Sequence, residues 1–121
     1  MHIRIFRTKR IYEAPESGDG VRVLVDRIWP RGMTKEKAQI AVWMKEIAPS
    51  AGLRRWFGHE PDRFAEFSRR YEEELLRGDA RNDLDQLRIW ADESPVTLLY
   101  SARDERHNQA VALKLLLERD T

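Results

Sequence analysis

Two short segments of the chain combine arginines with side chains that can move protons. The first is segment 26–32, Asp-Arg-Ile-Trp-Pro-Arg-Gly, and the second is segment 101–104, Ser-Ala-Arg-Asp. Guanidinium groups bind phosphates and carboxylates through paired, charge-assisted hydrogen bonds, each contributing about 1.5–3 kcal/mol. The two segments therefore predict a binding site for a small anion, with Arg27, Arg31 and Arg103 as its cationic residues.

Further side chains of both segments, and one just beyond the second, are candidates for contact with such a ligand. The ligand-binding candidates are Arg27, Trp29, Arg31, Gly32, Ser101, Arg103, Asp104 and Asn108. If the protein is an enzyme, we expect transfer or hydrolysis at an anionic ester, with the arginines stabilising developing charge. Proton transfer would then fall to Asp26, Ser101 or His107.

Each candidate also has a structural role that suits its position. Arg27 can pair with Asp26 or Asp104 and so tie two strand ends together, because structural ion pairs resemble functional sites. Trp29 can cover the edge of the core and Gly32 can serve a turn. Asp104 is typical of a residue that caps a helix.

The sequence gives no indication of a metal or a cofactor. It contains no cysteine, which excludes disulfides, zinc–thiolate sites and thiol nucleophiles. The three histidines, His2, His59 and His107, do not have the spacing of a metal-binding set. We therefore expect neither a metal centre nor a bound cofactor.

Length and composition indicate one small domain spanning residues 1–121. The chain is 41% hydrophobic and 36% charged, which is enough apolar material for a single core. No apolar run approaches the roughly 20 residues of a membrane-spanning helix, and the first residues do not open a signal peptide. We expect a cytoplasmic protein that does not interact with membranes.

Charge is distributed unevenly although the net charge is only +1. Residues 1–60 carry twelve Lys and Arg against seven Asp and Glu, and residues 61–121 carry ten against fourteen. This pattern leaves a second hypothesis open, a nucleic-acid-binding module that contacts phosphates through its basic amino-terminal half. The residues would be Arg4, Arg7, Lys9, Arg10 and the arginines of the two segments described above. A third hypothesis is a protein-interaction or homodimer unit that uses exposed tryptophans.

Hydrophobic periodicity predicts the elements that would position the candidates. Segment 21–25 and Val96–Tyr100 have the apolar, β-branched character of central strands, and Ile3 and Ile5 alternate with polar residues as in a half-buried strand. Between the first two strands, segment 14–20 is predicted to be an exposed, mobile loop. The fold class is α/β: a small sheet of about three strands with a parallel central pair, packed by about five helices.

The helices are expected at five places. Thr34 starts a helix that runs to Ile47, and Ser50 starts a short one that ends at Gly58. Pro61 opens a longer helix that stops at Gly78, and Leu84, Leu87 and Ala91 mark another. The last helix begins at Asp104 and places His107 in its first turn. In an open parallel sheet, ligands lie beyond the carboxyl ends of the strands, where segments 26–32 and 101–104 are expected to meet.

Three blocks of sequence resemble the bacterial YeaO-like family of unknown function. They are segment 17–32, segment 45–50 followed by Leu53-Arg54, and segment 97–104. The resemblance covers nearly the whole chain and implies a small cytosolic α/β domain, with no activity to carry over. In the wider group of related domains a Cys-His-Arg element often begins the last helix, and the corresponding stretch here is Arg106-His107-Asn108. The missing cysteine excludes a thiol mechanism. His107 is not a fixed feature of the family, so the resemblance favours Asn108, Ser101, Arg27 and Arg31 as site residues.

Overall fold

A computed structural model describes residues 3–119 and confirms the α/β class. Within these residues the sheet has four strands, β1 (Phe6–Arg10), β2 (Val21–Leu24), β3 (Val42–Trp43) and β4 (Val96–Tyr100). Their order is β1-β4-β2-β3, and each neighbouring pair is parallel. The central pair, β2 and β4, is therefore parallel as expected, and the sheet has one short strand more than predicted.

Five α-helices accompany the sheet in the part of the chain described. They are α1 (Lys35–Ala38), α2 (Ala51–Phe57), α3 (Phe64–Leu75), α4 (Gly78–Ala91) and α5 (Gln109–Arg119). The predicted start of α2 is confirmed, because the Ser50 hydroxyl accepts a hydrogen bond from the Leu53 amide at 3.2 Å. Gly78 does not end α3 as predicted. It begins α4, since α3 already ends at Leu75.

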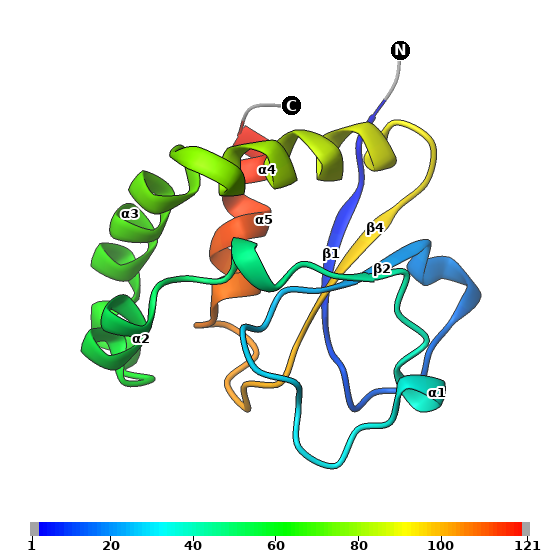
Figure 1. Cartoon of the computed structure of the whole chain (residues 1–121), viewed down its shortest axis with the longest axis horizontal. Coiled ribbons are helices and arrows are strands. Elements are labelled where there is room, and N and C mark those ends of the chain that lie inside the picture. The colour runs from blue at the N-terminus through cyan, green and yellow to red at the C-terminus, as the bar shows by residue number, and fades with distance from the viewer. Residues whose placement is uncertain (1–2, 120–121) are drawn as a thin grey trace.

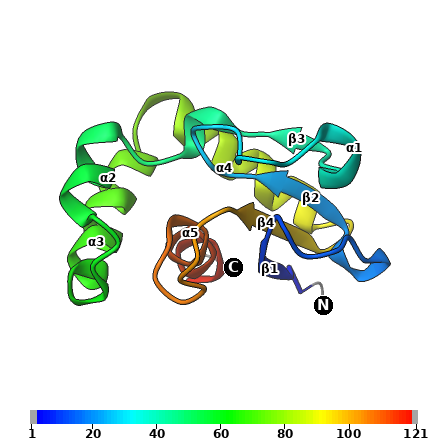
Figure 2. The same ribbon diagram turned by 90° about the horizontal axis from the view of Figure 1, so that it is seen from below.

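The helices and loops form a layer on each face of the sheet. Alternate side chains of β2 and β4 join the main core, to which α2, α3, α4 and α5 contribute. The opposite face carries a second, smaller core that α1 helps to cover, and its buried members are Ile11, Leu24, Ala38 and Leu99. Figure 1 shows α2, α3 and α5 grouped away from α1, and Figure 2 shows the same separation from below.

The predicted helix from Thr34 to Ile47 is wrong beyond its first turn. Thr34 does cap α1, but Gln39 adopts a left-handed conformation at φ 45° and ends it. The chain then runs alongside β2 as β3, with the Met44 amide donating to the Leu24 carbonyl at 2.9 Å. Pairing with a sheet edge therefore replaces the helical pattern that the apolar spacing suggested.

The first strand begins later than the isoleucine pattern predicts. Phe6 is buried, whereas Ile3 and Ile5 are 71% and 42% exposed. A shift of one residue in a strand moves every side chain to the other face, which explains the error. The pairing of β1 with β4 also fixes its direction as parallel.

The segment before β2 is largely exposed, as predicted, but it contains a short helical turn and one buried aspartate. Residues Ser17–Asp19 form a 3₁₀ turn in which Asp19 is buried and accepts a hydrogen bond from the buried Arg22 guanidinium at 2.6 Å. Gly20 follows at φ 64°, and a Cβ atom there would lie 2.0 Å from the Pro95 carbonyl oxygen. Only glycine fits this close crossing of two backbones.

None of the helices in residues 3–119 combines the length and the apolar character that crossing a lipid bilayer requires.

Candidate functional site

The carboxyl ends of β2 and β4 bring Asp26 and Ser101 into direct contact. Asp26 lies two residues after β2, Ser101 directly follows β4, and the two strands are parallel neighbours. The Ser101 hydroxyl donates to Asp26 Oδ2 at 2.6 Å, and the Ser101 amide donates to the same oxygen at 3.1 Å. Gln109, the first residue of α5, donates to Asp26 Oδ1 at 2.6 Å. Asp26 therefore joins two strand ends to the last helix.

A pocket of about 370 Å³ opens beside this network. Its polar lining includes Asp26, Ser101, Asn108 and Gln109, and its apolar lining includes Phe57 and Phe67, whose rings stack with centroids 4.3 Å apart. Its cationic and imidazole side chains are Arg27, Arg54, Arg55, His59 and His107. The volume is within the range of pockets that hold small molecules.

Helix α2 contributes two arginines to this pocket because its apolar residues face the core. Leu53 and Phe57 are buried, which leaves Arg54 and Arg55 on the exposed side. Within residues 3–119 neither guanidinium group has a hydrogen-bond or ion-pair partner, although the charge of Arg54 acts on Asp26. The pocket thus has two cations available to a ligand.

Arg27 lines the pocket but makes neither of the ion pairs that its position suggested. Its Nη2 donates to the Ala48 carbonyl at 3.0 Å, its Nε donates to the Pro49 carbonyl at 3.4 Å, and Nη1 lies 4.0 Å from a Glu46 carboxylate oxygen. The alternative pairing of Arg27 with Asp26 or Asp104 is therefore wrong. Arg27 instead holds the segment before α2 against the end of β2.

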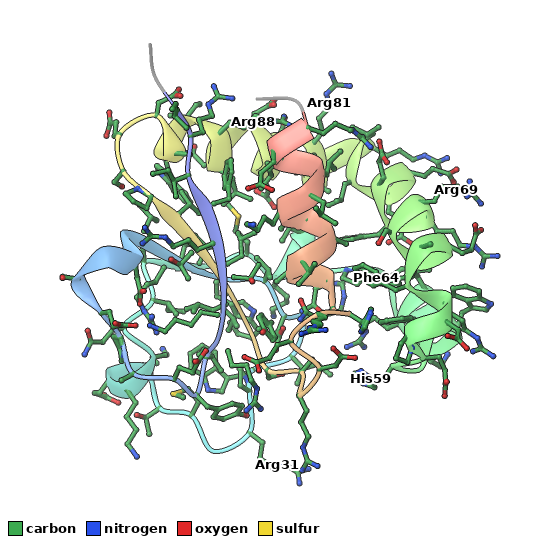
Figure 3. The ribbon with its side chains drawn as sticks, turned by 180° about the vertical axis from the view of Figure 1, so that it is seen from behind. Arg31, His59, Phe64, Arg69, Arg81 and Arg88 are labelled. Carbon is green, nitrogen blue, oxygen red and sulfur yellow. The ribbon has the colours of Figure 1, made fainter. Side chains whose placement is uncertain are left out.

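Five of the candidates do not line the pocket, namely Trp29, Arg31, Gly32, Arg103 and Asp104. Trp29 covers the second core, where its ring meets Trp43 edge to face at 5.4 Å, and its Nε1 donates to the Met33 carbonyl at 2.7 Å. Gly32 has a φ of 77°, as in a turn. Arg31 extends away from the molecule and does not lie beside His59 or Phe64, which are near the pocket (Figure 3). Arg103 is exposed.

The last helix starts later than predicted, at Gln109 rather than after Asp104. Asn108 is its cap, because Asn108 Oδ1 accepts from the Val111 amide at 3.0 Å. Asp104 instead shapes the preceding loop, where its Oδ1 accepts from the amides of Arg106 and His107 at 2.9 and 3.1 Å. His107 is therefore a loop residue and not part of the first helical turn.

The same loop fixes the ring of His107 at the edge of the pocket. His107 Nδ1 lies 2.9 Å from Asp104 Oδ2, and the ring meets Phe64 edge to face at 5.3 Å. The backbone amide of Arg106 and the ring of His107 together lower the pKa of Asp104 below its ordinary value. An ionised Asp104 thus orients His107 without itself lining the pocket.

Burial raises the pKa of Asp26 above its ordinary value, although the hydrogen bonds from Ser101 and Gln109 and the charge of Arg54 act to lower it.

No group of three or more histidine, aspartate and glutamate side chains suited to a metal ion occurs among residues 3–119. His2 lies outside the described residues.

Sequence reasoning missed Arg54, Arg55, His59 and Gln109 as pocket residues. The signal available for the arginines was their position between Leu53 and Phe57 on a short amphipathic segment, which places both on the exposed side. Arg54 also lies within one of the blocks that resemble the YeaO-like family.

Comparison with known proteins identifies the family. A family model described as the inactive DUF488-N3 subclade matches residues 5–121. An uncharacterized protein of Mycobacterium tuberculosis strain H37Rv is 43% identical over 111 residues, which are 92% of each chain. The uncharacterized protein YeaO of Escherichia coli K12 is 41% identical over 105 residues, 87% of this chain and 90% of the relative. No solved structure matches the chain. The chain therefore belongs to the inactive DUF488-N3 subclade and is a bacterial YeaO-like protein of unknown function.

Proposed function

We propose that this protein binds a small phosphate- or carboxylate-bearing molecule in the pocket beside Asp26 and Ser101. The observation that carries the proposal is the pair of guanidinium groups of Arg54 and Arg55 at a pocket of about 370 Å³, with no ionic partner inside residues 3–119. Two such groups bind an anion through charge-assisted hydrogen bonds. From the sequence, anion binding is expected of Arg27, Arg31 and Arg103. The proposal assigns this role to Arg54 and Arg55 of α2 instead.

Binding fits the geometry better than turnover does. The Ser101 hydroxyl already donates to Asp26, and the His107 ring is held by Asp104 rather than by Ser101. A serine nucleophile needs a base aligned with its hydroxyl, and a carboxylate alone is a weak one for that proton. The description of the family as inactive also supports a binding role. A cytoplasmic location, where phosphorylated metabolites are abundant, is part of the proposal.

Thermal unfolding with a panel of nucleotides, sugar phosphates and small carboxylic acids tests the proposal. At about 100 times its dissociation constant, a ligand that binds one site stabilises the folded protein by about 2.7 kcal/mol. We expect at least one anion of the panel to raise the Tm by several degrees. The double variant Arg54→Ala/Arg55→Ala is expected to lose that shift, since both free cations are removed.

The matched control is Arg31→Ala/Arg81→Ala, which removes the same charge from two exposed positions away from the pocket (Figure 3). This control is expected to keep the full ligand-induced shift. Absence of a shift with every anion, or a shift that survives in Arg54→Ala/Arg55→Ala, would contradict the proposal.

A further inference from the structure

Asp26 is a buried carboxylate whose direct hydrogen bonds all come from neutral groups. It is only 8% exposed, and its three donors are the Ser101 hydroxyl, the Ser101 amide and the Gln109 side chain. A carboxylate has about four acceptor positions. Two of the bonds end on Oδ2 and one on Oδ1, which leaves an acceptor position on Oδ1.

In the other buried aspartate, Asp19, the negative charge is balanced by cationic hydrogen-bond donors. Asp19 accepts hydrogen bonds from both Lys9 and Arg22, at 3.2 and 2.6 Å. A carboxylate removed from water is stabilised chiefly by such a hydrogen-bonded cation. Among the described residues that bury a carboxylate this deeply, Asp26 is the one without a cationic donor, and it lines a pocket.

The pocket therefore presents two opposite charges to a ligand. The buried carboxylate of Asp26 lies beside the partly buried Ser101 and Gln109, and Arg54 and Arg55 lie on the exposed side of α2. The lining also includes apolar side chains, among them Phe57, Phe67 and Pro49. A molecule that matches this lining has a cationic N–H donor, an apolar middle and an anionic end.

We propose that the ligand of this pocket is a small zwitterion, an amine or amidine joined by a short apolar linker to a phosphate or carboxylate. Its N–H donor takes the open acceptor position of Asp26, and its anionic group binds Arg54 and Arg55. This inference rests on the proposed function, since it assumes that the two arginines bind an anion. It adds that Asp26 selects the ligand by its opposite end.

Isothermal titration with two series of probes tests the selectivity. One series consists of ω-aminoalkyl phosphates with linkers of two to six carbons, and the other consists of n-alkyl phosphates of matching length. We expect the best aminoalkyl phosphate to bind the wild-type protein at least tenfold more tightly than its alkyl partner. The gain is expected to peak at one linker length, because Asp26 and the two arginines are each held by an element of the fold.

The variant Asp26→Asn identifies the group that recognises the amine. Asparagine keeps the shape and an acceptor for Ser101, and Gln109 can turn its amide to accept from the new NH₂ group. We expect the amine preference, the ratio of the two affinities measured in the same variant, to fall to within threefold. The control is Asp83→Asn, because burial also raises the pKa of Asp83 but this residue does not line the pocket. Asp83→Asn is expected to retain the full preference.

The outcomes separate this inference from the proposed function. Alkyl phosphates that bind in an Arg54- and Arg55-dependent manner without any gain from an amine would overturn the zwitterion proposal and leave anion binding intact. An amine preference that persists in Asp26→Asn would also overturn it. If neither series binds, the zwitterion proposal fails, and the thermal-unfolding panel decides separately whether the pocket binds an anion. The comparison of the two probe series on the wild-type protein can overturn the inference by itself. The inference therefore stays testable even if Asp26→Asn does not fold.

Discussion

Asp26 affects the stability of the folded protein in two opposite ways. It connects β2, β4 and α5 through hydrogen bonds from Ser101 and Gln109. It also keeps a carboxylate out of water, which favours the neutral form and raises its pKa in the folded protein. A group that costs stability at neutral pH and contacts a pocket is typical of functional positions.

The raised pKa of Asp26 predicts how stability depends on pH. Because the folded protein holds this proton more tightly than the unfolded chain, the contribution of Asp26 to stability is largest below its ordinary pKa and falls as the pH rises through the folded value. Urea unfolding of wild type and Asp26→Asn between about pH 3 and pH 7 measures the difference. We expect wild type to lose stability relative to Asp26→Asn as the pH rises, and then to level off. A difference that does not vary with pH would contradict the prediction.

Asp104 is expected to behave in the opposite way. Its lowered pKa means that its stabilising contribution is present above its ordinary pKa and is lost as the pH falls through the folded value. The two aspartates therefore respond to acid with opposite signs, although both lie near the start of the last helix.

At the scale of elements, the start of α5 positions much of the site. Asn108 is 2% exposed, caps the helix through Val111, and donates from Nδ2 to the Asp104 carbonyl at 2.9 Å. Gln109, which holds Asp26, is the next residue. The cap therefore determines where the helix begins and which side chain reaches the ends of the strands.

Replacement of this cap has a measurable cost. We expect Asn108→Ala to lower the free energy of unfolding by about 0.5–2 kcal/mol, the range for removal of a helix cap. Asn108→Ser retains an oxygen for the Val111 amide and is expected to recover part of that loss. Urea titrations of the three proteins provide the comparison. Equal stability of wild type and Asn108→Ala would show that the cap is dispensable.

Strong local patterns predicted the elements well, and tertiary packing determined the rest. Val96–Tyr100 is a strand and Leu84, Leu87 and Ala91 are buried on one helix, as their apolar spacing predicts. The segment after Ala38 also has helical spacing, but its backbone pairs with β2 instead. Apolar spacing shows which residues are buried, and it does not show which neighbour buries them.

The site follows the same division. The contact between Asp26 and Ser101 could be predicted because the ends of neighbouring parallel strands meet at one edge of a sheet. The exposed side of α2 that carries Arg54 and Arg55 could be predicted as well, but its place at the pocket could not, because that depends on how α2 packs against α3. The partners of Arg27 are backbone carbonyls, which a list of charged residues does not include.

At the scale of the whole molecule, the basic amino-terminal residues are largely engaged within the fold. Arg4 pairs with Asp92 at 2.7 Å and thereby links the basic half of the chain to the acidic half. Arg7 donates to the Gly18 carbonyl, and Arg10 donates to the carbonyls of Ser101 and Ala102. The tryptophans are only partly exposed as well. These contacts leave the nucleic-acid and homodimer hypotheses with less free surface than the sequence suggested.

We therefore expect only weak binding to nucleic acid. Fluorescence anisotropy with a mixed-sequence DNA duplex should give a dissociation constant weaker than about 100 µM near physiological salt, the weak end of the non-specific range. A smaller dissociation constant that increases steeply with added salt would support the nucleic-acid hypothesis. It would also require the internal pairs of Arg4, Arg7 and Arg10 to open.

The position of β4 between β1 and β2 affects how the protein emerges from the ribosome. The two strands made first do not pair with each other. Both pair with Val96–Tyr100, and β2 pairs with β3 as well. During synthesis β1 has no strand partner until β4 has left the exit tunnel, and Asp26 meets Ser101 only then. The pocket is thus completed only in the final stage of translation, because a nascent chain stalled before β4 still lacks Ser101, His107, Asn108 and Gln109.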